Sequence, residues 1–277
     1  MAPPTSAALT GIDTHAHIFE RDLPLTAGRR YSPEYDARVE QYLAHLDRSG
    51  LSHGVLVQPS FLGTDNRYMV EALSRHPARL RGTAVVENDI DGATLNALEE
   101  AGVVGIRLNL IGKNPQAYLS AQWQALFAEL GRRGWSVEVQ RGIDDIAQVV
   151  QPILASGVTV VVDHFGLPAG ALDPARAGDR ALLELAASED VWVKLSAPYR
   201  CEAGLAQAQA SLSRLREAFG HSERLVWGSD WPHTRFEAQT DYAAQIAFME
   251  ALLPQAEERQ RVLCDNPARL FKIERSA

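Results

Sequence analysis

Residues 135–164 read WSVEVQRGIDDIAQVVQPILASGVTVVVDH, in which two short valine-rich segments flank a longer amphipathic segment. The segments 135–140 and 158–164 are short, apolar and rich in β-branched residues, which is typical of buried strands. The segment 143–156 has its apolar residues at helical spacing. A strand, a helix and a second strand of these lengths form a parallel βαβ unit, so this stretch indicates an α/β fold.

The same alternation of short apolar and longer amphipathic segments extends outward to both ends of the chain. Strands are predicted near Gly11–His15, His53–Gln58, Arg81–Val86, Val103–Asn109, Trp135–Gln140, Val158–His164, Val191–Ser196 and Arg224–Asp230. Helices are predicted near 34–49, 66–76, 92–101, 120–133, 143–156, 178–188, 203–219 and 236–253. Eight such repeats predict a TIM (β/α)8 barrel as one domain over residues 1–277, close to the usual size of about 250 residues. A doubly wound open sheet is the alternative.

Composition and charge exclude several classes of protein. A formal net charge of −8 argues against nucleic acid as a partner, because no basic face offsets it. No apolar run approaches the roughly 20 residues that cross a bilayer, which argues against a membrane protein. The two cysteines, Cys201 and Cys264, are far apart, which favours reduced thiols over a disulfide framework. The first residues, MAPPTS, lack the features of a secretory signal, so a cytoplasmic location is expected.

Polar side chains recur at every second position where the predicted strands end. Residues two apart on a strand share a face, and the chemistry of such barrels lies at the C-terminal ends of the strands. The alternate positions are mostly apolar, as packing against helices requires; examples are Val55, Val57, Val137 and Val139. The polar positions are predicted to face the barrel lumen; they are Asp13, His15, His17, Gln58, Ser60, Arg107, Asn109, Ser136, Glu138, Gln140, Lys194, Ser196, Arg200 and, with Gly228, Asp230.

Three segments carry the strongest chemical signals. GIDTHAH at 11–17 places two imidazoles on one strand end, a spacing that suits a shared metal ion or two donors to one oxygen. VVVDHFG at 160–166 ends a buried strand in His164, and LVWGSDWPH at 225–233 ends the last strand in Asp230. Taken singly, each has a plainer interpretation, as surface histidines, a hydrogen-bonded core histidine or a helix cap.

Together these three segments resemble the amidohydrolase superfamily, in which HxH follows the first strand, a histidine ends the sixth and an aspartate ends the eighth. The segment DNPARLF at 265–271 is similar to the closing helix of that superfamily. Within it, the chain most resembles the group of 2-pyrone-4,6-dicarboxylate lactonases and sugar lactonases. The further points of similarity are QPS at 58–60, GTDN at 63–66, GIRLN at 105–109, KLS at 194–196 and PYR at 198–200. The resemblance implies a hydrolase that opens a lactone, a carboxylic ester.

The middle strands depart from the metal-dependent members of the superfamily, which usually add a lysine, glutamate or histidine there. Here the fourth strand supplies Arg107, a cation that repels a metal, and the fifth supplies Glu138 and Gln140. Catalytic zinc normally takes three protein ligands from a histidine-rich set. We therefore expect no cofactor to be required; the alternative is one zinc ion held by His15, His17 and Asp230.

Basic residues at the predicted mouth point to an anionic substrate. Arg107 and Arg200 are expected to bind a carboxylate, since guanidinium matches its geometry. Lys113 stands where the resemblance implies a second arginine, which leaves the identity of the carboxylated lactone open. Further hydrogen bonds to substrate are expected from Ser60, Thr64, Tyr199 and His233. We interpret Arg67 and Arg141 as members of surface ion pairs, and the polar segment 21–33 as a lid or substrate-binding loop.

The mechanism that these residues suggest is direct attack of water on a carboxylated lactone. Asp230 is expected to act as general base, and His15, His17 and His164 to donate hydrogen bonds to the lactone carbonyl. The partner expected is thus a small anionic lactone or carboxylic acid. Three alternatives remain: a single-zinc hydrolase or nonoxidative decarboxylase, a lactone isomerase, and a non-catalytic barrel that binds a small acid. A carboxylate facing three histidines argues against the last.

Overall fold

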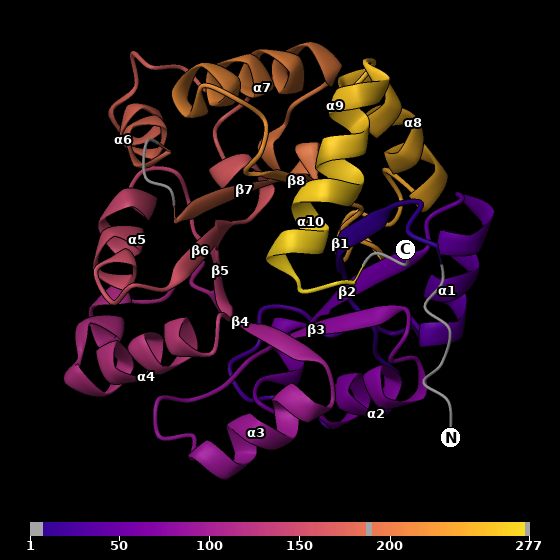
Figure 1. Ribbon diagram of the computed structural model, residues 1–277, viewed down its shortest axis with the longest axis vertical. Coiled ribbons are helices and arrows are strands. Elements are labelled where there is room, and N and C mark those ends of the chain that lie inside the picture. The colour runs from indigo at the N-terminus through magenta and orange to yellow at the C-terminus, as the bar shows by residue number, and fades with distance from the viewer. Residues whose placement is uncertain (1–7, 187–189, 275–277) are drawn as a thin grey trace.

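The computed structural model describes residues 8–186 and 190–274, and its eight strands form one parallel sheet in sequence order (Figure 1). Valine-rich and other apolar segments of four to seven residues form them, because both faces of the sheet are buried. The strands are β1 Ile12–Ala16, β2 His53–Val57, β3 Leu80–Ala84, β4 Val103–Asn109, β5 Ser136–Gln140, β6 Thr159–Val162, β7 Val191–Ser196 and β8 Leu225–Gly228. All eight predicted strands are therefore confirmed.

The two edges of the sheet meet just beyond β8. The backbone N–H of Asp230 donates to the carbonyl of His15 at 2.8 Å, and that of His17 donates to the carbonyl of Trp231 at 2.7 Å. Ala16 and Trp231 form the corresponding parallel bridge. The predicted TIM barrel is confirmed, and the open doubly wound sheet is wrong.

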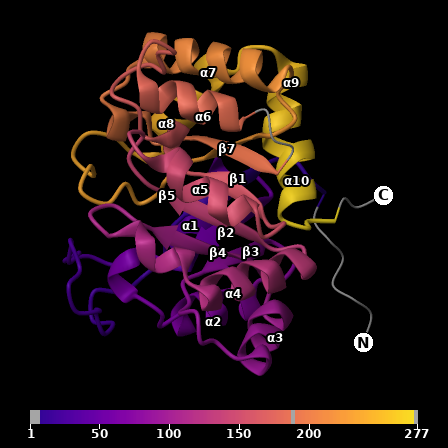
Figure 2. The same ribbon diagram turned by 90° about the vertical axis from the view of Figure 1, so that its left-hand side faces the viewer.

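Helices surround the barrel (Figures 1 and 2). They are α1 Val39–Arg48, α2 Arg67–Arg75, α3 Gly92–Glu100, α4 Ala121–Arg132, α5 Ile146–Leu154, α6 Ala177–Leu185, α7 Leu205–Phe219, α8 Tyr242–Leu252, α9 Ala256–Gln260 and α10 Asn266–Leu270. A π-helical turn, Arg261–Asp265, joins α9 to α10, and short 3-10 turns follow β2, β4, β6 and β7. Within the described residues, no helix combines the length and hydropathy needed to cross a bilayer.

Two predicted helices begin later than the sequence pattern suggested. Residues 34–38 do not join α1, because Ala37 exchanges two backbone hydrogen bonds with Phe19, each 2.8 Å long. This bridge anchors the end of the 21–33 loop. Helix α8 begins at Tyr242, where the side chain of Asp241 accepts from the N–H of Ala244 and caps the helix.

The barrel interior is apolar at its N-terminal end. Ile12, Val55, Val161 and Val226 meet there, and Phe271, which follows α10, packs against them. The C-terminal helix thus covers this end of the barrel. The buried polar side chains of the barrel interior lie at the opposite end, where the C-terminal ends of the strands are.

Two strands depart from the predicted alternation of faces. In β1, Asp13 pairs with Gly54 while Ala16 pairs with Leu56, so Thr14 and His15 together occupy a position opposite one residue. This β-bulge turns Asp13 away from the face of His15. Asp13 instead accepts from the Ser229 hydroxyl at 2.6 Å and from Tyr242 on α8 at 3.1 Å.

In β2 the predicted faces are reversed. Val55 faces the interior rather than the helices, and the side chain of Gln58 points to the loop that follows. Its amide nitrogen donates to the carbonyl of Asp65 at 2.8 Å and to that of Gly63 at 3.3 Å. The prediction failed because a buried polar side chain can satisfy loop carbonyls as well as face a lumen.

Candidate active site

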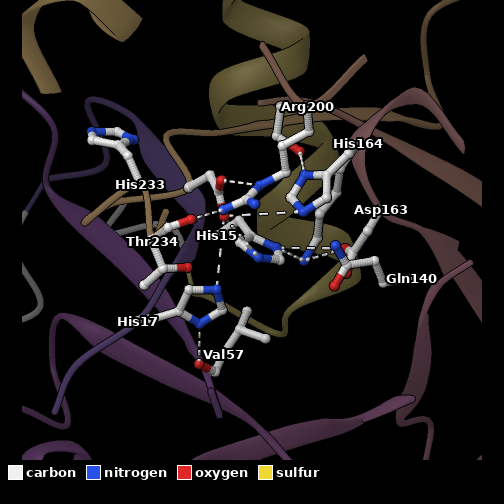
Figure 3. Close-up of polar contacts among 12 residues, drawn as sticks. His15, His17, Val57, Gln140, Asp163, His164, Arg200, His233 and Thr234 are labelled. Carbon is white, nitrogen blue, oxygen red and sulfur yellow. Dashed lines mark hydrogen bonds and ion pairs between the residues drawn. The ribbon is translucent and has the colours of Figure 1, made fainter. Parts of the chain in front are cut away.

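Three imidazole rings point toward one carboxylate oxygen at the C-terminal end of the barrel. His15 and His17 lie at the end of β1, His164 follows β6 and Asp230 follows β8. The Nε2 atoms of His15 and His17 each lie 3.7 Å from Asp230 Oδ1, and that of His164 lies 4.0 Å away. These separations exceed a direct hydrogen bond, and all four side chains are buried. Figure 3 shows the rings of His15, His17 and His164 grouped together. The arrangement suits one small polar group that contacts several of these atoms at once.

The tautomer of His17 is fixed by a backbone carbonyl. Its Nδ1 lies 2.7 Å from the carbonyl oxygen of Val57, which only accepts, so Nδ1 carries the hydrogen (Figure 3). Burial lowers the pKa of His17 to about 3, and the ring is neutral near pH 7. Its Nε2 therefore presents a lone pair to the centre. This corrects the expectation that His17 donates a hydrogen bond to the substrate carbonyl.

The other two histidines are also held through Nδ1. In His164 this atom lies 2.8 Å from the Ser196 hydroxyl, and in His15 it lies 3.1 Å from Lys194 Nζ. Burial lowers the pKa of His164 to about 4. Burial and the nearby Lys194 charge also lower the pKa of His15. All three rings at the centre are therefore neutral at physiological pH, and they donate or accept according to their tautomers.

The two oxygens of Asp230 have different surroundings. Oδ2 accepts from the Tyr199 hydroxyl at 2.6 Å and from Arg200 Nε at 2.7 Å, while Oδ1 has no hydrogen-bond partner among the described residues. Burial alone would raise the pKa of this carboxyl group, but the Arg200 guanidinium and its other neighbours together outweigh burial and hold the pKa well below its ordinary value. Asp230 is therefore ionised, with one oxygen directed at the histidines. Its φ of 60° lies in the left-handed region, a strained conformation that is typical of functional sites.

Four arginines surround the cavity above this centre. The cavity has a volume of about 80 Å³, and its cationic lining consists of Arg30, Arg107, Arg200 and Arg235. Arg107 contacts Gln140 at 2.6 Å and Asp163 at 3.4 Å. Neither Arg30 nor Arg235 has a carboxylate partner within 8–186 and 190–274, and Arg30 instead donates to Asn109 at 3.0 Å. Unpaired guanidinium groups at a cavity favour an anionic ligand.

A second, larger cavity of about 340 Å³ adjoins the first. The two share Arg30, Ser60, Arg107 and Asn109, so a ligand that fills one reaches the border of the other. The lining of the larger cavity includes both polar groups and apolar ones, Trp123 among them.

The predicted substrate-binding residues are distributed over both cavities and the region behind them. Arg107, Arg200 and Ser60 line the smaller cavity, whereas Thr64 and Lys113 line the larger one. Tyr199 and His233 line neither of these two cavities, so their expected role in substrate binding stays a prediction. The Tyr199 hydroxyl contacts His233 Nδ1 at 3.1 Å while it donates to Asp230, so the pair supports the carboxylate from behind.

Other predicted residues lie outside the site. Arg67 and Arg141 form ion pairs with Asp65 and Asp145, as expected. Cys201 and Cys264 are both buried, and no disulfide joins them.

Gly228 has a steric role in this site. A Cβ atom at this position would lie 2.5 Å from the Cβ of His15 and 2.8 Å from its backbone nitrogen. Only glycine therefore lets β8 approach the bulge of β1 closely enough to aim His15 at Asp230.

Below the histidines lies a charged network that the sequence indicated only by its alternating polar positions. Lys194 Nζ lies 2.7 Å from Glu138 Oε2, and Thr83 donates to the other oxygen of Glu138 at 3.1 Å. Burial raises the pKa of Glu138. Burial would raise that of Asp163 too, but Lys194 and its other neighbours hold it well below the ordinary value. All of these side chains are fully buried, so their charges act on the site without solvent screening.

The sequence analysis missed Arg30, Tyr31 and Arg235, which line the smaller cavity. Arg30 and Tyr31 belong to the 21–33 segment, and the consecutive pair Arg29-Arg30 was the available signal there. The path of this loop depends on long-range contacts, such as the 2.8 Å bond from the N–H of Thr26 to the carbonyl of Phe61. Local sequence does not encode such contacts.

Residues 12–273 match the family model described as amidohydrolase. The chain belongs to the amidohydrolase family. Among curated relatives of this amidohydrolase, a 2-pyrone-4,6-dicarboxylate hydrolase of Comamonas testosteroni is 30% identical, with 94% of this chain and 89% of that protein covered. A 4-sulfomuconolactone hydrolase of Rhizobium radiobacter is 28% identical over the same shares of the two chains. A solved structure from Pseudomonas putida, described as a candidate 2-pyrone-4,6-dicarboxylic acid hydrolase, is 43% identical, with a TM-score of 0.90 and 97% and 99% covered.

Proposed function

We propose that this amidohydrolase opens a small lactone bearing an acidic group, by direct attack of water. The observation that carries the proposal is the ionised Asp230, with its free Oδ1 facing three neutral histidines beneath an arginine-lined cavity. The curated relatives named as hydrolases of 2-pyrone-4,6-dicarboxylate and 4-sulfomuconolactone support the same class of substrate. The substrate class is therefore a lactone with one or more acidic groups.

The proposed steps balance without a further reactant. Asp230 Oδ1 takes one proton from the attacking water. The second hydrogen of the water stays on its oxygen and is hydrogen-bonded to His17 Nε2. The water oxygen bonds to the lactone carbonyl carbon, while His15 and His164 donate hydrogen bonds to the developing oxyanion. The ring C–O bond then breaks, and the leaving oxygen takes the proton from Asp230. The products are a carboxylate and a hydroxyl group on one open chain, with one proton released to solvent.

The arginines hold the acidic groups of the substrate. Arg107 and Arg200 line the smaller cavity as expected, and Arg30 lies on the border with the larger one. Arg200 also contacts Asp230, so a substrate carboxylate that binds this guanidinium shares its charge. The basicity of Asp230 then rises when an acidic substrate binds, which links recognition to catalysis.

The test of this proposal uses a panel of carboxylated pyrones, muconolactones and aldonolactones, with acid release and product structure as readouts. One acidic lactone is expected to yield its open-chain acid. Asp230→Asn keeps the shape and removes the base, so we expect kcat to fall about 10²–10⁴-fold with little change in KM and an unchanged circular dichroism spectrum. A folded Asp230→Asn variant with normal turnover, or an isomeric lactone as product, contradicts the proposal.

We further propose that the reaction requires no metal. The atoms of His15, His17 and Asp230 lie close enough together to share one ion. However, two of these three residues contact a cation: Lys194 Nζ lies 3.1 Å from His15, and Arg200 Nε lies 2.7 Å from Asp230. These cations contact His15 Nδ1 and Asp230 Oδ2, the atoms that face away from the centre. Lys194 thereby leaves the hydrogen of the neutral His15 ring on Nε2, and Arg200 weakens the carboxylate as a ligand, so this set fits zinc poorly.

Dialysis against a strong chelator is therefore expected to leave lactonase activity nearly unchanged. Metal content is measured on the same preparation before and after dialysis. Activity that is lost on removal of stoichiometric zinc and restored on its return contradicts metal independence, but it leaves lactone hydrolysis itself in place.

A further inference from the structure

A lysine that contacts the reacting centre through His15 lies directly beneath it. Lys194 projects from β7 into the barrel and is fully buried. Its Nζ lies 2.7 Å from Glu138 Oε2, 3.1 Å from His15 Nδ1 and 3.5 Å from Asp163 Oδ1. An ammonium group has three hydrogens to donate and no lone pair to accept with. The contacts with Glu138 and His15 are thus the two close ones, and the contact with Asp163 is a longer ion pair.

The contact with His15 decides which ring nitrogen of that residue carries the proton. Because Lys194 can only donate, His15 Nδ1 must accept, and the hydrogen of the neutral ring lies on Nε2. The competing arrangement has His15 Nδ1–H donating to Asp163 Oδ1. That distance is 3.5 Å, longer than an ordinary hydrogen bond, and Asp163 also lies 3.4 Å from Arg107 Nε. The geometry thus favours the proton on Nε2.

We propose that Lys194 is a positioning residue that holds His15 in its Nε2–H tautomer and thereby keeps the site from binding a divalent metal through His15. A nitrogen that carries a hydrogen cannot ligate a metal, so the possible ligand set of His15, His17 and Asp230 loses one member. The inference rests on the proposed function only in taking His15 as a donor to the substrate carbonyl.

The two histidines of the HxH motif then have opposite hydrogen-bonding characters. The Val57 carbonyl makes His17 an acceptor at Nε2, and Lys194 makes His15 a donor at Nε2. One accepts from water while the other donates to the carbonyl oxygen. A symmetric pair of lone pairs, which a shared metal ion requires, is absent from this arrangement.

The test compares the wild type with Glu138→Gln and with the double variant Lys194→Met/Glu138→Gln. Lys194→Met alone leaves Glu138 buried without its cation and endangers folding. The double variant removes both charges together, and Glu138→Gln alone keeps the ammonium beside His15. In protein labelled with ¹⁵N-histidine, long-range proton–nitrogen correlation spectra at pH 7.5 identify the protonated ring nitrogen; His15→Gln assigns its signals.

We expect Nε2–H in the wild type and in Glu138→Gln, and Nδ1–H, directed at Asp163, in the double variant. We also expect the double variant to bind zinc about 10–100-fold more tightly than the other two, as measured by calorimetry with zinc alone. An Nδ1–H tautomer in the wild type, an unchanged tautomer in the double variant, or equal zinc affinity in all three proteins overturns the proposal. None of these readouts depends on lactone turnover, so they separate this inference from the proposed function.

Discussion

Asp230 is held in its ionised form, as a general base must be, but the same contacts lower its affinity for a proton. Arg200 and Tyr199 both bond its Oδ2, which keeps the carboxylate ionised but also makes it a weak proton acceptor in the free protein. An acidic substrate that binds the same arginine reduces this effect at the moment when basicity is needed. The residue therefore gains catalytic strength only with the substrate that the arginines select.

The pH dependence of kcat/KM follows from these groups. In the free protein the pKa of His164 is about 4, that of His17 is about 3, and that of Asp230 is well below its ordinary value. Because kcat/KM reports ionisations of free enzyme and free substrate, we expect it to be constant from about pH 6 to 8 on a fully ionised acidic lactone. Initial rates at low substrate concentration measure it. A kcat/KM that falls as the pH is lowered through an ionisation near pH 7 would falsify this assignment of the essential groups.

The central residues could be predicted from sequence because parallel strands all open on one rim. His15, His17, His164 and Asp230 lie near three different strand ends, and barrel closure alone brings them together. Their hydrogen-bond roles could not be predicted. The role of His17 depends on a backbone carbonyl 40 residues away and that of His15 on a lysine 179 residues away.

At the scale of the elements, alternation predicted the lumen face of β5 and β7 but failed in β1 and β2. Glu138 and Lys194 meet inside the barrel as their positions indicated. The bulge in β1 adds a residue that the local sequence pattern does not predict. It places Asp13 against α8 and not on the lumen face. One inserted residue moves every side chain before it to the other face of the strand. The alternation of faces can therefore be used for prediction only along a strand without a bulge.

The 21–33 segment supplies an arginine to the site, as expected of a substrate-binding loop. Arg30 borders both cavities and donates to Asn109 at 3.0 Å, with no carboxylate partner within the residues that the structure describes. Arg30→Gln is expected to raise KM for an acidic lactone by about tenfold to a hundredfold, the effect of one lost charged hydrogen bond, with a smaller change in kcat.

Steady-state kinetics with an acidic lactone and its uncharged analogue test this role of Arg30. Arg67→Gln serves as the matched control, since Arg67 is 84% exposed and paired with Asp65. Equal losses on both substrates show that Arg30 shapes the loop rather than binds the acid.

For the molecule as a whole, the barrel interior is divided into an apolar end and a charged end. Phe271 and the strand valines fill the first, and the network around Lys194 fills the second. The sequence indicated only the charged end, because polar residues recur at alternate positions where the predicted strands end. The consequence of this division is a set of buried, neutral histidines at the catalytic end, which ties the stability of the whole barrel to pH.

Burial lowers the pKa of His15, His17, His164 and His233, to about 4 in the case of His233. In the unfolded chain a histidine titrates near pH 6.5, so from pH 7 to 5.5 the unfolded state takes up protons that the folded state does not. Stability therefore falls with falling pH, by about 1 kcal/mol for each such histidine over this range. Glu138 and Asp13, whose pKa values burial raises, act in the opposite direction.

Comparison of variants isolates the contribution of one histidine from these opposing effects. His164→Gln removes a single buried imidazole, so we expect the loss of unfolding free energy between pH 7 and 5.5 to be about 1 kcal/mol smaller than in the wild type. Urea titrations at the two pH values measure the difference, and His221→Gln, at an exposed turn after α7, is the control. If His164→Gln and the wild type lose the same free energy, His164 is not buried in its neutral form, and the donor role proposed for it at the oxyanion is lost as well.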